Sequence, residues 1–141
     1  MIQAATVAWV IAADERFLFV EEAIDGTATL NQPAGHWEPG ETLIEAACRE
    51  LQEETSLQLP PQGLVGIYRL SLPHKTFWRH VFWTTLDSPL PCQPQDPDIV
   101  ACHWLSATQL RHWHQRSPLV AKAIDDYQQG CRYPLSVLQH A

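Results

Sequence analysis

The chain has 141 residues, a formal net charge of −7 and four cysteines. This length suits one domain with a full core, and the acidic balance disfavours a nucleic-acid or anionic-membrane surface, because clustered Lys and Arg bind phosphate backbones. The cysteines lack C-x-x-C spacing, and no apolar run approaches the ~20 residues of a membrane span. We therefore expect a single cytoplasmic domain over residues 1–141, with no membrane or nucleic-acid partner.

The first half of the sequence predicts strands followed by one helix. Apolar, β-branched and aromatic residues form two runs around a polar turn, which predicts a hairpin. Three strands are expected, at residues 6–12, 17–22 and 27–31. Thr42 and Glu45 form a Thr-x-x-Glu capping box, which predicts a helix over residues 43–55.

The second half predicts another hairpin and two more helices. We expect strands at residues 63–72 and 77–86, a proline-rich loop at 88–97, a strand at 100–105, a helix from Ser106 to about 114 and a last helix capped by Ser117-Pro118 and ending at Gly130. The strand at 77–86 carries large side chains on both faces, so we expect it to be covered on both sides. Residues from about 131 form a tail without recognisable chemistry. Strands on both sides of a central helix predict an α/β or α+β fold with helices packed on a mixed sheet.

The central predicted helix carries an acidic face. Glu50, Glu53 and Glu54 are spaced i, i+3, i+4, so they lie within one arc beside the apolar stripe. Clustered carboxylate oxygens suit hard divalent ions such as Mg²⁺ or Mn²⁺. Gly35 lies in a stiff turn before the helix, where its carbonyl could join the carboxylates as a ligand. An isolated acidic helix face is more often solvated surface. The choice between a metal site and solvated surface therefore depends on the residues around this helix.

The wider stretch is GHWEPGETLIEAACRELQEETSL, residues 35–57. Its six informative positions would coincide by chance at about 10⁻⁷ per starting point; they are Gly35, Glu41, Arg49, Glu50, Glu53 and Glu54. The stretch resembles the Nudix box of the Nudix hydrolase superfamily and matches every charged position. Ser56 departs from that pattern, because the box usually has a glycine there. A non-glycine residue costs about 1 kcal/mol if it ends the helix in the left-handed conformation.

The resemblance implies a fold and a set of residue roles. The fold would be an α/β/α sandwich around a mixed sheet, with the box as a loop–helix–loop. Mg²⁺, or alternatively Mn²⁺, would be held by Gly35, Glu50, Glu53 and Glu54. Glu50 or Glu53 would accept a proton from the attacking water, Arg49 would orient a glutamate, and Glu41 would brace the loop or Arg49 from outside the reacting centre. The alternatives for the base are Asp96 and Asp98, which we read first as loop surface. Three basic residues are candidates to reach substrate phosphates, or else ordinary surface: Arg69, Lys75 and Arg79.

Other stretches resemble one phosphatase branch of the same superfamily. They lie at residues 31–36, 95–99, 116–120 and 127–135. This similarity implies a Mg²⁺-dependent monomer, with a homodimer as the alternative, that releases phosphate from small molecules. The implied substrates are nucleoside di- and triphosphates and thiamine-type pyrophosphates, including hydroxymethylpyrimidine pyrophosphate. Two alternatives stay open: hydrolysis of a narrow substrate such as a dinucleotide polyphosphate or oxidised nucleotide, and a nucleotide-binding module without catalysis. Such modules often lose a box glutamate, whereas this chain keeps all three.

Overall fold

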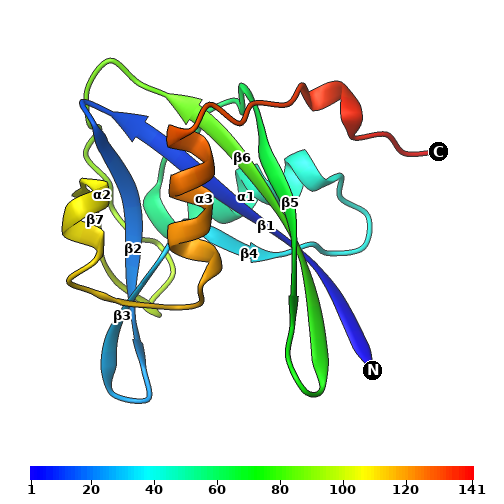
Figure 1. The fold of residues 1–141 in the computed structure, drawn as a ribbon, viewed down its shortest axis with the longest axis horizontal. Coiled ribbons are helices and arrows are strands. Elements are labelled where there is room, and N and C mark those ends of the chain that lie inside the picture. The colour runs from blue at the N-terminus through cyan, green and yellow to red at the C-terminus, as the bar shows by residue number, and fades with distance from the viewer.

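A computed structural model describes all residues from 1 to 141. Eight strands form one mixed sheet with helices on both faces, so the expected α/β/α sandwich is confirmed (Figure 1). The strands are β1 (Ile2–Ala13), β2 (Arg16–Ile24), β3 (Thr27–Asn31), β4 (Ala34–His36), β5 (Gly63–Ser71), β6 (Lys75–Thr85), β7 (Ile99–Leu105) and β8 (His114–Gln115). The helices are α1 (Leu43–Thr55), α2 (Ala107–Leu110), α3 (Leu119–Gln128) and the 3₁₀ helix η1 (Leu135–Val137). None of them has the length and hydropathy to cross a membrane.

Strand β1 organises the sheet. It runs parallel to β6 along nearly its whole length, and β5 pairs antiparallel with the far side of β6. The expected hairpin of β1 with β2 exists only at its turn, where Ala12 pairs with Phe17 and Ala13 with Arg16. In the earlier part of β1, Thr6, Val7 and Ala8 pair instead with β4. This arrangement carries the segment before α1 to the centre of the sheet.

Two apolar clusters fill the two faces of the sheet. On one face, Trp9 and Leu51 belong to the cluster that packs α1 against β1. The Trp9 indole Nε1 also donates a buried hydrogen bond of 2.7 Å to the carbonyl of Ala47, which fixes the helix on the sheet. On the other face, Val81 and Ile124 belong to the cluster beneath α3. Figure 1 shows α3 in front of the sheet and α1 behind it. The expectation that β6 is covered on both sides is therefore confirmed.

Helix α1 has the bounds that the sequence predicts. Thr42 Oγ1 accepts a hydrogen bond from the Glu45 backbone N–H, and the Glu45 carboxylate accepts one from the Thr42 N–H. At the other end, Ser56 keeps the left-handed conformation with φ 66°. Its hydroxyl donates to the carbonyl of Gln93, so the helix end is tied to the proline-rich loop. The left-handed cap is thus retained without glycine.

Four local features differ from the expectation. The helix after Ser106 ends at Leu110, because the next three N–H groups turn back to carbonyls three residues earlier. Strands β4 and β8 have three and two residues, too short to show a strand pattern in sequence. Helix α3 ends at Gln128 rather than at Gly130, whereas the expected cap is present in part, because Ser117 Oγ accepts a 3.2 Å hydrogen bond from the Leu119 N–H. The stretch after 131 is docked on the sheet, where Tyr133 and Leu64 exchange two backbone hydrogen bonds of 2.8 Å.

Candidate active site

The loop before α1 is packed directly against the helix. Strand β4 pairs with β1 and places Gly35 beside the Glu50 side chain. A Cβ atom added at Gly35 would overlap the Glu50 carboxylate. The backbone φ of Gly35 is not positive, so glycine is needed here for space rather than for backbone conformation. Gly35 and Glu50, 15 residues apart in the sequence, therefore lie side by side.

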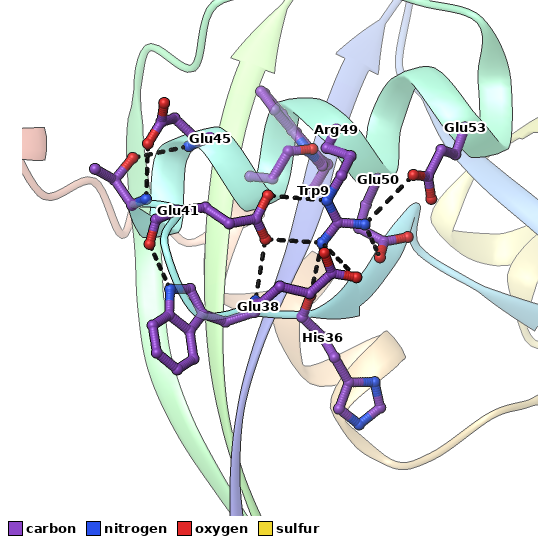
Figure 2. A network of polar contacts seen from close by, with 11 residues as sticks. Trp9, His36, Glu38, Glu41, Glu45, Arg49, Glu50 and Glu53 are labelled. Atoms are coloured by element: carbon purple, nitrogen blue, oxygen red, sulfur yellow. Dashed lines mark hydrogen bonds and ion pairs between the residues drawn. The ribbon is translucent and has the colours of Figure 1, made fainter.

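Arg49 connects the loop to the helix, as Figure 2 shows. Its Nε and Nη2 donate to the two oxygens of Glu41, each at 2.9 Å, and Nη2 also donates to the His36 carbonyl at 2.9 Å. Nη1 donates to Glu50 Oε1 at 2.8 Å and more weakly to Glu53 Oε1 at 3.4 Å. The guanidinium thus holds the loop and two of the predicted metal ligands at once.

Glu41 braces this connection from the loop side. One carboxylate oxygen accepts both from Arg49 and from the backbone N–H of Glu38, at 3.0 Å for the latter. The Glu41 carbonyl accepts a 2.6 Å hydrogen bond from the indole of Trp37. The hydrogen bonds from Arg49 lower the pKa of Glu41. Glu41 therefore stays ionised and keeps the guanidinium fork in one orientation.

Glu54 is the buried carboxyl of the group, with only 7% of its surface exposed. Its Oε1 accepts a 2.8 Å hydrogen bond from the backbone N–H of Ala34. Burial raises its pKa to about 8, and the nearby Glu50 adds to that shift. The ionised form of Glu54 has no bonded cation among the protein's side chains, so a bound cation would stabilise it strongly.

These residues fit a hard divalent cation. Carboxylate and carbonyl oxygens are the donors that Mg²⁺ and Mn²⁺ prefer, and Glu53, with 46% of its side chain exposed, is free to turn toward an ion. The predicted ligands are adjacent, but no three His, Cys, Asp or Glu side chains form a ready-made metal cluster. Arg49 holds Glu50 and Glu53 in this arrangement. The ligand set therefore remains a prediction.

Replacing Arg49 by lysine tests this connecting role. We expect kcat to fall about 10- to 100-fold, because a lysine ammonium has no planar fork to hold Glu41, Glu50 and the loop carbonyl together. The measurement is kcat and the half-maximal Mg²⁺ concentration, with a thermal melt for each protein. Arg111→Lys, at an exposed position, is the matched control and should behave as wild type. An unchanged kcat in Arg49→Lys would contradict the role.

The two alternative bases lie on the loop that follows the helix end. The backbone N–H of Asp96 donates to the Glu53 carbonyl at 2.9 Å, and Asp98 donates from its own N–H to the Asp96 side chain. The charge of Asp96 also contributes to the raised pKa of Glu54. Asp96 is therefore close to the box, whereas Asp98 is exposed. Neither assignment is tested by this geometry.

A cavity of about 460 Å³ opens beside Glu54, Gly35 and His36. Residues from β5, β6 and the start of α3 also line it, and they include Phe77 and Arg79. The remaining lining residues are Thr6, Glu22, Asn31, Ala34, Leu70, Leu72, Arg116, Ser117, Pro118 and Leu119. The sequence does not reveal that most of these residues line one cavity, because pairing between distant strands brings them together. The volume lies in the range of small-molecule sites.

Comparison with known proteins places this chain among hydrolases of one family. Residues 1–123 match the model of the NUDIX domain. The chain is 49% identical over 135 residues to phosphatase NudJ of Escherichia coli strain K12. The aligned residues cover 94% of this chain and 88% of that protein. The structure of a NUDIX hydrolase from Nitrosomonas europaea superposes with a TM-score of 0.89 and 42% identity, over 99% and 97% of the two chains. A MutT protein from Methanosarcina mazei, at 17% identity and a TM-score of 0.77 over 91% and 94%, shares the fold.

Proposed function

The chain belongs to the Nudix family and is a Nudix hydrolase, and on that premise we propose that it is a Mg²⁺-dependent phosphatase of small organic phosphoanhydrides. Its substrates would be nucleoside di- and triphosphates and thiamine-type pyrophosphates, including hydroxymethylpyrimidine pyrophosphate, from which it would release phosphate. The observation that carries the proposal is the buried Glu54 carboxyl, which lies beside Glu50 and at the wall of a substrate-sized cavity. The identity to phosphatase NudJ supports the substrate class.

The residue roles in the proposed reaction are those that the family resemblance implies, and the positions of the residues support them. Glu50, Glu53, Glu54 and the Gly35 carbonyl would hold Mg²⁺, or Mn²⁺ in its place. The bound cation would neutralise phosphoryl charge and acidify a water molecule. Glu50 or Glu53 would accept the proton of that water. Of the two, Glu50 is the better oriented, because Arg49 fixes its Oε1 and Gly35 leaves room beside its carboxylate.

Arg49 and Glu41 would act through other groups. The bidentate pair of Arg49 with Glu41 holds the guanidinium in place, and the guanidinium holds Glu50. Burial raises the pKa of Glu50, while Arg49 opposes that shift. Arg49 therefore favours the ionised form of Glu50, which is the form that can accept a proton. We propose both residues as positioning residues.

A substrate panel tests the proposal. Orthophosphate and pyrophosphate release would be measured with and without Mg²⁺ on ADP, ATP, thiamine pyrophosphate, a dinucleotide polyphosphate and a nucleotide sugar. We expect Mg²⁺-dependent orthophosphate release from the nucleotides and from thiamine pyrophosphate. A single strong activity on the dinucleotide polyphosphate or nucleotide sugar would replace the substrate class but keep the chemistry. No metal-dependent release from any compound would contradict the proposal and favour a nucleotide-binding role.

A further inference from the structure

Arg79 is a buried cation that has no carboxylate partner. Only 9% of its surface is exposed, and its hydrogen bonds go from Nη2 alone, to the Asn31 side-chain oxygen at 2.9 Å and to the Gln32 side-chain oxygen at 2.8 Å. Both acceptors are neutral amides. The buried Nε has no hydrogen-bond partner, and no protein acceptor bonds Nη1 either. Burying a guanidinium whose N–H donors lack acceptors lowers the stability of the fold unless an anion binds to those donors.

Arg79 lines the cavity that opens beside Glu54. Arg79 and Glu54 both line that cavity and influence each other electrostatically, but no hydrogen bond joins them. Burial lowers the pKa of Arg79 to about 10, which still leaves the side chain protonated at neutral pH. The cavity wall also contains a second cation, Arg116, but that residue is exposed and interacts with Glu22 of the same wall, so Arg79 is the buried guanidinium of the cavity.

The other two basic candidates from this hairpin lie elsewhere. Arg69 is exposed and stacks over the ring of Trp78 at 5.9 Å. Lys75 lies over the ring of Phe77 at 4.8 Å and does not line the cavity. Of the three residues, Arg79 alone is both buried and in the cavity wall.

The surroundings of Arg79 hold it in a fixed orientation. Gln32 is fully buried and uses its amide twice: Oε1 accepts from Arg79, and Nε2 donates to the Val120 carbonyl at 2.8 Å. The guanidinium is thus tied through Gln32 to the first turn of α3. Such a preorganised donor binds an oxyanion with little loss of side-chain entropy.

We propose that Arg79 is the anion receptor of this cavity and binds a phosphate group of the substrate there. Phe77 and Leu70, next to it in the wall, would pack against the organic part of the same molecule. The preferred ligand is then an organic di- or triphosphate that reaches from Arg79 to the carboxylates of the box. This inference rests on the proposed function for the identity of the substrate, but binding alone can test it.

The test compares Arg79→Met, which removes the charge, with Arg79→Lys, which keeps it. The ligand is methylenediphosphonate, a non-hydrolysable diphosphate analogue without an organic ring, and its Kd is measured calorimetrically in Mg²⁺ and in EDTA. We expect Arg79→Met to weaken binding about 10- to 100-fold in the buffer where wild type binds more tightly. Arg79→Lys should recover part of that loss. Thermal melts would show whether each variant is folded.

Arg69→Met is the matched control, because it removes an arginine from the neighbouring strand at an exposed position outside the cavity. It should bind the diphosphonate as wild type does. A folded Arg79→Met variant whose Kd stays within about twofold of wild type would overturn the inference, and so would a wild-type protein that binds in neither buffer. Failure of the proposed function would be seen separately, as absence of Mg²⁺-dependent phosphate release by the wild-type protein.

If Arg79→Met does not fold, the inference is tested on Gln32→Leu. This variant removes the amide that orients Arg79 but leaves the charge. We expect it to raise KM for ADP more than it changes kcat, and to weaken diphosphonate binding relative to wild type. Unchanged diphosphonate binding in folded Gln32→Leu would overturn the inference in that case.

Discussion

Glu54→Gln is expected to lower Mg²⁺-dependent phosphate release by about 10²- to 10³-fold while leaving the fold intact. The amide oxygen can still accept the 2.8 Å hydrogen bond from Ala34, so the loop should stay in place. The amide cannot carry the negative charge that a divalent cation requires of this ligand. The measurement is the steady-state rate over a Mg²⁺ series, beside a thermal melt. Glu45→Gln, a same-helix change at an exposed position, is the control and should retain activity.

The same substitution has an expected signature in the metal-free protein. The folded-state pKa of Glu54, about 8, lies above its ordinary value of 4.5. The contribution of Glu54 to the free energy of unfolding is therefore complete below pH 4.5 and is lost as the pH rises toward 8. At neutral pH the loss is on the order of 3 kcal/mol. In EDTA, wild type should lose stability over this pH window, whereas Glu54→Gln should lose less and melt at a higher temperature at neutral pH. Near wild-type turnover in Glu54→Gln would contradict the metal assignment.

The sequence predicts the parts of this protein that depend on local spacing. The capping box at Thr42 and Glu45 fixes where α1 begins, and the i, i+3, i+4 spacing places Glu50, Glu53 and Glu54 on adjacent positions of the helix. The family resemblance adds the expectation that Glu41 braces the loop or Arg49, and two hydrogen bonds of 2.9 Å join these side chains. These features need only one helix and the loop before it, so no tertiary knowledge is required.

The remainder depends on pairing between distant segments. Strand β4 is three residues long and contains a glycine, so its place beside β1 follows from the sheet rather than from its own propensity. In sequence, Arg79 looks like one of three equivalent cations on a hairpin. Only the fold shows that it is buried and that Gln32, 47 residues earlier, accepts its hydrogen bond. Long-range contacts of this kind leave no periodic signal in a single sequence.

Gly35→Ala is expected to lower kcat about 10- to 100-fold with little change in stability. The new Cβ would overlap the Glu50 carboxylate, and because the backbone conformation at Gly35 suits any residue, the flexible Glu50 side chain should move rather than the loop. Its displacement would break the 2.8 Å hydrogen bond from Arg49 and move the carboxylate away from the position that Arg49 fixes. The measurement is kcat at saturating Mg²⁺ together with the melting temperature.

A double-mutant cycle with Glu50→Ala identifies the cause of that loss. If Gly35→Ala acts by displacing the Glu50 carboxylate, removing that side chain makes room for the methyl group, so the double variant should be no less active than Glu50→Ala alone. If the alanine instead disturbs the Gly35 carbonyl as a ligand, the two losses should multiply. Strongly non-additive losses would therefore show that glycine is required at position 35 to leave space for the Glu50 carboxylate.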